Sequence, residues 1–87
     1  MGQLDGKVVV ITGAGRGIGQ GLAIGFAEQG AKVVCSSRTA SQLVDTVRTI
    51  TGAGGEAIAV PCDVTSADDV QKLYDETMSA YGQVDVV

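Results

Sequence analysis

The sequence contains no histidine, no tryptophan, one proline and two cysteines. Without histidine the commonest metal ligand is missing, and Cys35 and Cys62 are too few for a disulfide framework or a four-ligand zinc site. No unbroken apolar run is longer than Val8–Ile11, whereas a membrane-spanning helix needs about 20 apolar residues. We therefore expect no bound metal, no membrane partner, and a reducing, cytoplasmic location.

Basic residues are also scarce, because six lysines and arginines stand against ten acidic residues, for a net charge of −4. The chain thus lacks the positive patch by which proteins bind nucleic acid or anionic lipid. Its 45% hydrophobic content is too high for a disordered chain, and 87 residues are enough for only one small domain. The N-terminal segment has no hydrophobic stretch typical of an export signal. A small-molecule partner is therefore favoured.

Apolar, β-branched segments alternate with amphipathic segments along the chain. Valine-rich segments that are apolar on both faces are typical of strands buried between helices in a parallel sheet. The pattern predicts strands at residues 7–12, 32–36, 56–60 and 84–87, with helices after the first strand, around residues 43–50, and between Ser66 and Gly82. We expect an α/β fold in which right-handed βαβ connections build a parallel sheet.

The first predicted helix has an apolar face and internal glycines. Ile18, Leu22 and Phe26 recur at a spacing of four residues, with Gly21 and Gly25 beside them. Each glycine inside a helix costs about 1 kcal/mol relative to alanine. We therefore expect this helix to lie very close to a neighbouring backbone.

A glycine-rich turn separates the first strand from the first helix. It contains Gly13, Ala14, Gly15, Arg16, Gly17, Ile18 and Gly19. At this position backbone N–H groups and the helix dipole can hold a pyrophosphate. Gly13 would allow the tight turn, Gly17 the approach of phosphate, and Gly19 the packing of helix on strand. The alternative is a merely flexible loop. No Gly-Lys-Ser/Thr follows, which excludes a P-loop NTPase, and Ile18 breaks the strict G-x-G-x-x-G register.

The remaining pattern, Thr-Gly-x-x-x-Gly-x-Gly over Thr12–Gly19, resembles the nucleotide loop of the short-chain dehydrogenase/reductase family, including its NADP-dependent 3-oxoacyl-reductase-like members. Asp63-Val64 is similar to the family's adenine-contacting pair, and residues 82–87 resemble its lead-in to an Asn-Asn-Ala-Gly motif. The resemblance implies the N-terminal part of a Rossmann-type doubly wound sheet, βαβαβαβ, with strand order 3-2-1-4. It also implies that Asp63 hydrogen-bonds the adenine while Val64 contacts its ring. Asp63 has an alternative role as a turn former at a strand end.

The choice of cofactor depends on the end of the second strand. An acidic residue about 20 positions after the loop would bind the ribose 2′-hydroxyl of NAD. Ser37 and Arg38 stand there instead, and with Arg16 they form a candidate pocket for the 2′-phosphate of NADP. The alternative for both arginines is a solvated surface cation. We expect NADP as cofactor, with NAD less favoured.

The chain offers no catalytic residue. The family's proton donor lies in a Tyr-x-x-x-Lys motif, but Tyr74 is followed four residues later by Met78, and Tyr81 by Asp85. Residues 1–87 are therefore interpreted as a single, incomplete dinucleotide-binding domain. It would be the cofactor-binding portion of an oxidoreductase whose complete chain binds a carbonyl or alcohol substrate and can form homo-oligomers. The alternatives are a stand-alone, non-catalytic nucleotide-binding module or a truncated inactive product.

Overall fold

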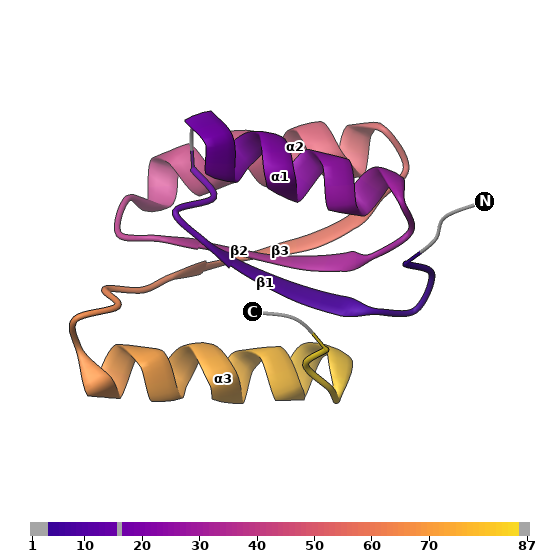
Figure 1. The fold of residues 1–87 in the computed structure, drawn as a ribbon. Helices are drawn as coiled ribbons and strands as arrows, with labels where there is room; N and C mark the ends of the chain where they lie inside the picture. Colours follow the sequence, from indigo (N-terminus) through magenta and orange to yellow (C-terminus); the bar gives the residue numbers. More distant parts are fainter. Residues whose placement is uncertain (1–3, 16, 86–87) are drawn as a thin grey trace.

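A computed structural model describes residues 4–15 and 17–85 of the chain. Three parallel strands form a sheet in the order β1-β2-β3, and the elements alternate strictly between strand and helix. Figure 1 shows α1 and α2 on one face of this sheet and α3 on the other. The α/β fold and its doubly wound arrangement are thus confirmed. The elements are β1 Val8–Thr12, α1 Gly17–Glu28, β2 Lys32–Ser37, α2 Ala40–Gly52, β3 Glu56–Pro61 and α3 Ala67–Tyr81.

Both faces of β1 and β2 are buried, which explains the unbroken runs of valine in these strands. Val9 and Val33 belong to a core cluster together with Ala23 of α1 and Leu43 of α2. The alternate residues, among them Val8, Val10 and Val34, form a second cluster with Leu73 of α3. Because successive side chains of a strand point to opposite faces, one apolar segment supplies both cores.

The inward face of α1 differs from the expected one. Ile18 is 85% exposed and Leu22 is 49% exposed, whereas Ala23 is buried and Phe26 packs partly against the core. Gly19, Ala23 and Ala27 are also spaced by four residues, and the helix turns this side toward the sheet, with Ile24 and Phe26 packing at its margins. Small side chains permit close packing, so hydrophobicity alone selected the wrong face.

The helix expected between Ser66 and Gly82 is α3, and these two residues cap it. Ser66 Oγ accepts a hydrogen bond from the Asp69 N–H at 3.3 Å, and Gly82 closes the helix with φ +74°. In a capping box the Asp69 carboxylate would accept a hydrogen bond from the Ser66 N–H. Here its Oδ2 accepts from the N–H of Asp63 instead, at 2.9 Å. Asp69 therefore ties the start of α3 to the segment that leaves β3.

After α3 the chain returns to the edge of β1. The Asp85 N–H donates to the carbonyl oxygen of Val8 at 2.9 Å, and the Val8 N–H donates to Asp85 Oδ2 at 2.8 Å. Val84 and Asp85 are not in a strand, so within the described residues the sheet has three strands. Val86 and Val87, the rest of the predicted fourth strand, lie outside the described residues, and the order 3-2-1-4 stays a prediction at its last position. None of the described helices has the length and hydropathy to cross a membrane.

Candidate functional site

An open cavity of about 550 Å³ lies where the chain leaves the carboxyl ends of the three strands. In open α/β sheets this edge is where ligands bind. Its walls come from the turn after β1, the turn between β2 and α2, the first turn of α2, and the segment after β3. The lining residues are Thr12, Gly13, Gly15, Ser37, Arg38, Thr39, Gln42, Cys62, Asp63, Val64 and Thr65.

The backbone geometry of the turn requires glycine at three positions. Gly13 and Gly17 have φ of +71° and +61°, a region that other residues rarely adopt. A Cβ on Gly19 would overlap the carbonyl oxygen of Gly13, so the start of α1 packs directly on the turn. The expected partner of Gly19 was the strand, and the observed partner is the loop that follows it. Beside Gly17 the space is open.

The turn is anchored through a residue that does not line the cavity. Ala14 is buried, and its N–H donates to the carbonyl oxygen of Ser36 at the end of β2, at 3.0 Å. The carbonyl oxygen of Ala14 accepts from Thr46 Oγ1 of α2 at 2.8 Å. Of the other predicted loop residues, Gly17, Ile18 and Gly19 lie at the start of α1 outside the cavity lining, and Arg16 lies outside the described residues.

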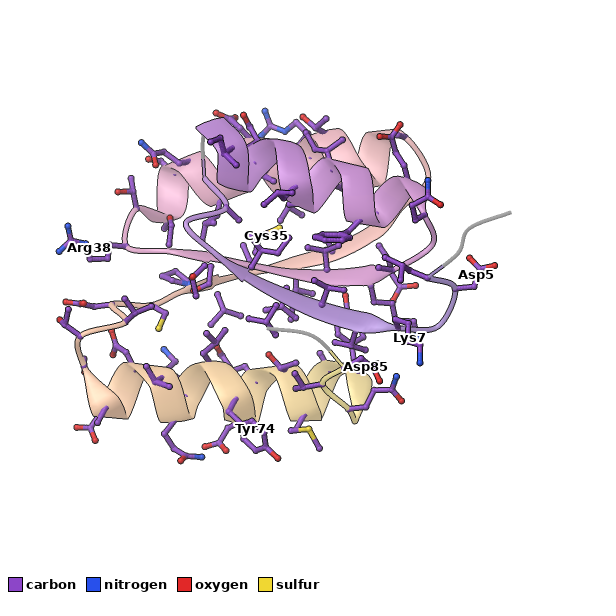
Figure 2. All side chains as sticks on the ribbon, viewed as in Figure 1. Asp5, Lys7, Cys35, Arg38, Tyr74 and Asp85 are labelled. Carbon is purple, nitrogen blue, oxygen red and sulfur yellow. The ribbon has the colours of Figure 1, made fainter. Side chains whose placement is uncertain are left out.

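Ser37 and Arg38 stand at the cavity where β2 ends. Ser37 Oγ donates to the carbonyl oxygen of Thr39 and accepts from the Thr39 N–H, both at 3.2 Å, which closes a tight turn before α2. Figure 2 shows Arg38 extending from this turn into solvent. Among the described lining residues Arg38 is the one cation and Asp63 the one anion.

Asp63 forms the opposite wall. Its Oδ1 accepts from the Thr65 N–H at 2.9 Å and from Thr65 Oγ1 at 2.6 Å, so it shapes the turn that leads to α3. These hydrogen bonds, and more weakly the charge of Arg38, hold the pKa of the Asp63 carboxyl below its usual value. Asp63 therefore has the turn-forming role that was its alternative, and it also lines the cavity. Val64, beside it, is exposed.

The two cysteines occupy different places. Burial raises the pKa of the Cys35 thiol to about 11, so at neutral pH it is an inert core residue. Cys62 is buried too, but it lines the cavity at the end of β3. Thr39, Gln42 and Thr65 also line the cavity although no motif identified them. Thr39 and Thr65 directly follow predicted site residues, and Gln42 lies in the first turn of α2, four residues after Arg38.

A doubly wound parallel sheet with a glycine-rich turn at its carboxyl edge defines a Rossmann-type protein. A family model described as short chain dehydrogenase matches residues 7–87. The chain therefore belongs to the short-chain dehydrogenase family, and the resemblance found in the sequence is confirmed.

Curated relatives and solved structures agree with this family. A probable tetrahydroxynaphthalene reductase of Zymoseptoria tritici is 44% identical over an alignment of 89 positions, which covers 98% of this chain and 32% of the relative. A crystal structure of a hydroxysteroid dehydrogenase from Escherichia coli is 46% identical with a TM-score of 0.94, covering 95% of this chain and 35% of that one. The chain thus spans about a third of the length of the curated relatives it matches.

Similar structures have been solved with either dinucleotide. A metagenomic short-chain oxidoreductase in complex with NADP is 38% identical with a TM-score of 0.90, covering 95% of this chain and 38% of that one. A family member from Burkholderia phymatum in complex with NAD is 41% identical with a TM-score of 0.92, covering 99% and 31%. Overall similarity therefore does not separate the two cofactors, and the choice depends on individual residues.

Proposed function

We propose that this chain is the cofactor-binding portion of an NADP-dependent oxidoreductase that transfers a hydride between the nicotinamide and a carbonyl or alcohol carbon. The observation that carries the choice of NADP is the pair Ser37 and Arg38, which lines the cavity at the end of β2 in place of an acidic residue. A guanidinium binds phosphate through two parallel hydrogen bonds, whereas a carboxylate there would bind a ribose hydroxyl and repel phosphate.

The pyrophosphate, the 2′-phosphate and the adenine each have a matching group in this arrangement. The turn from Gly13 to Gly19 and the N-terminus of α1 would hold the pyrophosphate, and Ser37 and Arg38 the 2′-phosphate. Asp63 would hydrogen-bond the adenine and Val64 would contact its ring. When bound, NADP supplies the hydride-carrying nicotinamide. This chain's own residues would bind the adenosine and phosphate groups of NADP.

The described lining of the cavity contains one cation, Arg38, and one anion, Asp63. The whole chain has a net charge of −4, which works against a phosphate-rich ligand. Asp63 is already engaged by two hydrogen bonds from Thr65, so its negative charge is partly compensated within its own turn. Among the described residues that line the cavity, Arg38 is therefore the cationic group available to an additional phosphate.

Neither Tyr74 nor Tyr81 is placed to donate a proton at the cavity. Figure 2 shows Tyr74 on the side of α3 that points away from the sheet, and the ring of Tyr81 packs under Lys32 Nζ at 5.6 Å. Neither residue belongs to the cavity lining. A general acid must lie within hydrogen-bond reach of the reacting oxygen.

Titration of NADP(H) and NAD(H) into the wild type and an Arg38→Asp variant tests the proposal. We expect the wild type to prefer NADP, and Arg38→Asp to weaken NADP binding by about 10- to 150-fold with little change for NAD. Arg48→Asp is the matched control, because Arg48 is an exposed arginine of α2 outside the cavity lining. A ratio of the two affinities that does not move in Arg38→Asp would contradict the proposal.

A further inference from the structure

Thr46 is a buried polar residue at the contact between α2 and the glycine-rich turn. Its Oγ1 lies 2.8 Å from the carbonyl oxygen of Ala14 and 3.5 Å from the carbonyl oxygen of Gln42, one turn earlier in its own helix. A threonine hydroxyl has one proton to donate, and hydroxyl hydrogen bonds favour separations of about 2.7–2.8 Å. The bond therefore goes to the turn and not to the helix.

A second side chain completes the contact from α1. Gln20 Nε2 donates to Thr46 Oγ1 at 3.2 Å, so this hydroxyl both gives and receives a hydrogen bond. Ala14 is held at its other end by the bond from its N–H to Ser36. Thr46 thus joins the turn, α1 and α2 at one buried point.

This contact fixes the direction of one peptide group. In a trans peptide the C=O and the following N–H point in opposite directions. Because the carbonyl of Ala14 points to Thr46, the N–H of Gly15 points away from Thr46. Gly15 belongs to the cavity lining, and within the described residues its N–H has no hydrogen-bond acceptor.

We propose that Thr46, supported by Gln20, is a positioning residue that holds the Ala14–Gly15 peptide so that the Gly15 N–H is presented to the pyrophosphate of the dinucleotide. This inference rests on the proposed function, because it concerns how the same cavity binds its ligand. A preset donor binds phosphate without the cost of ordering the turn. Thr46 itself touches no cofactor in this role.

The test uses Thr46→Val and Thr46→Ser with two ligands. Valine keeps the branched shape and removes the hydroxyl, while serine keeps the hydroxyl. NADP carries the pyrophosphate, and adenosine 2′-monophosphate lacks it while keeping the groups expected at Arg38 and Asp63. We expect Thr46→Val to weaken NADP binding by about 3- to 10-fold, as for one lost hydrogen bond, with adenosine 2′-monophosphate unchanged. Thr46→Ser should restore NADP affinity to within about twofold of the wild type.

Thr77→Val is the matched control. Thr77 is equally buried, and its Oγ1 donates to the carbonyl oxygen of Leu73 at 2.8 Å. That acceptor lies within α3, on the other face of the sheet from the turn. The two valine variants thus lose a similar hydroxyl and a similar bond, and only Thr46→Val should lose NADP affinity.

Gln20→Leu provides a second, milder variant. Its side chain is only partly buried, so we expect the fold to persist and NADP affinity to fall by about twofold. If Thr46→Val loses the dispersed amide spectrum of a folded protein, this variant decides. A selective loss of NADP affinity in Gln20→Leu supports the proposal, and unchanged NADP affinity overturns it.

The outcomes separate this inference from the proposed function. A wild-type protein that binds neither ligand would overturn the proposed function and this inference with it. Wild-type binding that stays intact, with equal NADP losses in Thr46→Val and Thr77→Val, would overturn the inference alone. Loss of NADP and adenosine 2′-monophosphate to the same extent in Thr46→Val would overturn it as well, because a general loosening of the fold affects both ligands.

Discussion

The glycines at the start of α1 differ from those inside the helix in what the backbone requires of them. Gly13, in the turn before α1, has a positive φ, and Gly19, in the first turn of α1, leaves no room for a Cβ beside the carbonyl oxygen of Gly13. Gly21 and Gly25, two and six residues after Gly19, have negative φ and open space where a Cβ would be. The expectation that these two internal glycines mark a close backbone approach is therefore wrong. The close approach is confined to the start of the helix, next to the cavity.

Replacing Gly19 by alanine should disrupt the packing of α1 on the glycine-rich turn. The added Cβ would overlap the Gly13 carbonyl oxygen, so either α1 or the turn must move. We expect the free energy of unfolding to fall by about 1–3 kcal/mol, as for other overpacked sites, and NADP binding to be lost or severely weakened. Denaturant unfolding and cofactor titration measure the two effects. A variant with wild-type stability and affinity would show that the turn does not need this contact.

Replacing Gly21 or Gly25 by alanine should instead raise the free energy of unfolding. Both sites are helical with free space, so alanine removes conformational freedom from the unfolded chain without a clash. We expect the free energy of unfolding to rise by about 0.5–1 kcal/mol for each replacement, with cofactor affinity unchanged. Urea unfolding of the two alanine variants beside Gly19→Ala gives the comparison directly. A destabilised Gly21→Ala would mean that the outer side of α1 is in contact with something in solution.

The smallest effect on stability is expected at the opposite end of β1, where Asp85 forms hydrogen bonds with Val8. The hydrogen bond from the Val8 N–H, helped by Gln83 and Lys7, lowers the pKa of the Asp85 carboxyl from its usual 3.8. A group whose pKa is lower in the folded state adds stability that is present above its unfolded value and is lost as the pH falls through its folded value. Unfolding midpoints should therefore decrease below about pH 4, and Asp85→Asn should reduce that slope slightly, because the carboxylate is exposed. If the slope of the unfolding midpoint against pH is unchanged in Asp85→Asn, the contact with Val8 does not contribute to stability in acid.

The strands and the turn motif were predictable because their signals are local. Val8, Val9 and Val10 form an unbroken apolar run since both faces of β1 are buried, and the turn follows this strand in the expected register. The inward face of α1 was not predictable from spacing, since a large-residue face and a small-residue face repeat with the same period of four. Packing against the turn at Gly19 selects the small one.

The contacts that anchor the turn could not be predicted from the sequence. Thr46 lies three residues after Leu43 and four before Ile50, so the helical period places it on the buried side of α2, unlike the exposed Thr49 and Thr51. Its hydrogen-bond partners, Ala14 and Gln20, are 32 and 26 residues away in the chain, and no local pattern predicts them. Only the fold brings α1, α2 and the turn together. The same holds for Gln42, whose side chain reaches the cavity beside Gly15 because α2 begins at that edge of the sheet.

Amide NMR during a titration with NADP tests most directly where the dinucleotide binds. With the cofactor at the carboxyl edge of the sheet, we predict saturable shifts at Gly13, Gly15, Arg38 and Asp63, which line the cavity after each of the three strands. Amides near Asp85, at the other end of β1, should stay in place. Shifts that gather around Asp85, or no saturable shifts in a folded protein, would contradict the assignment of the cavity as the dinucleotide site.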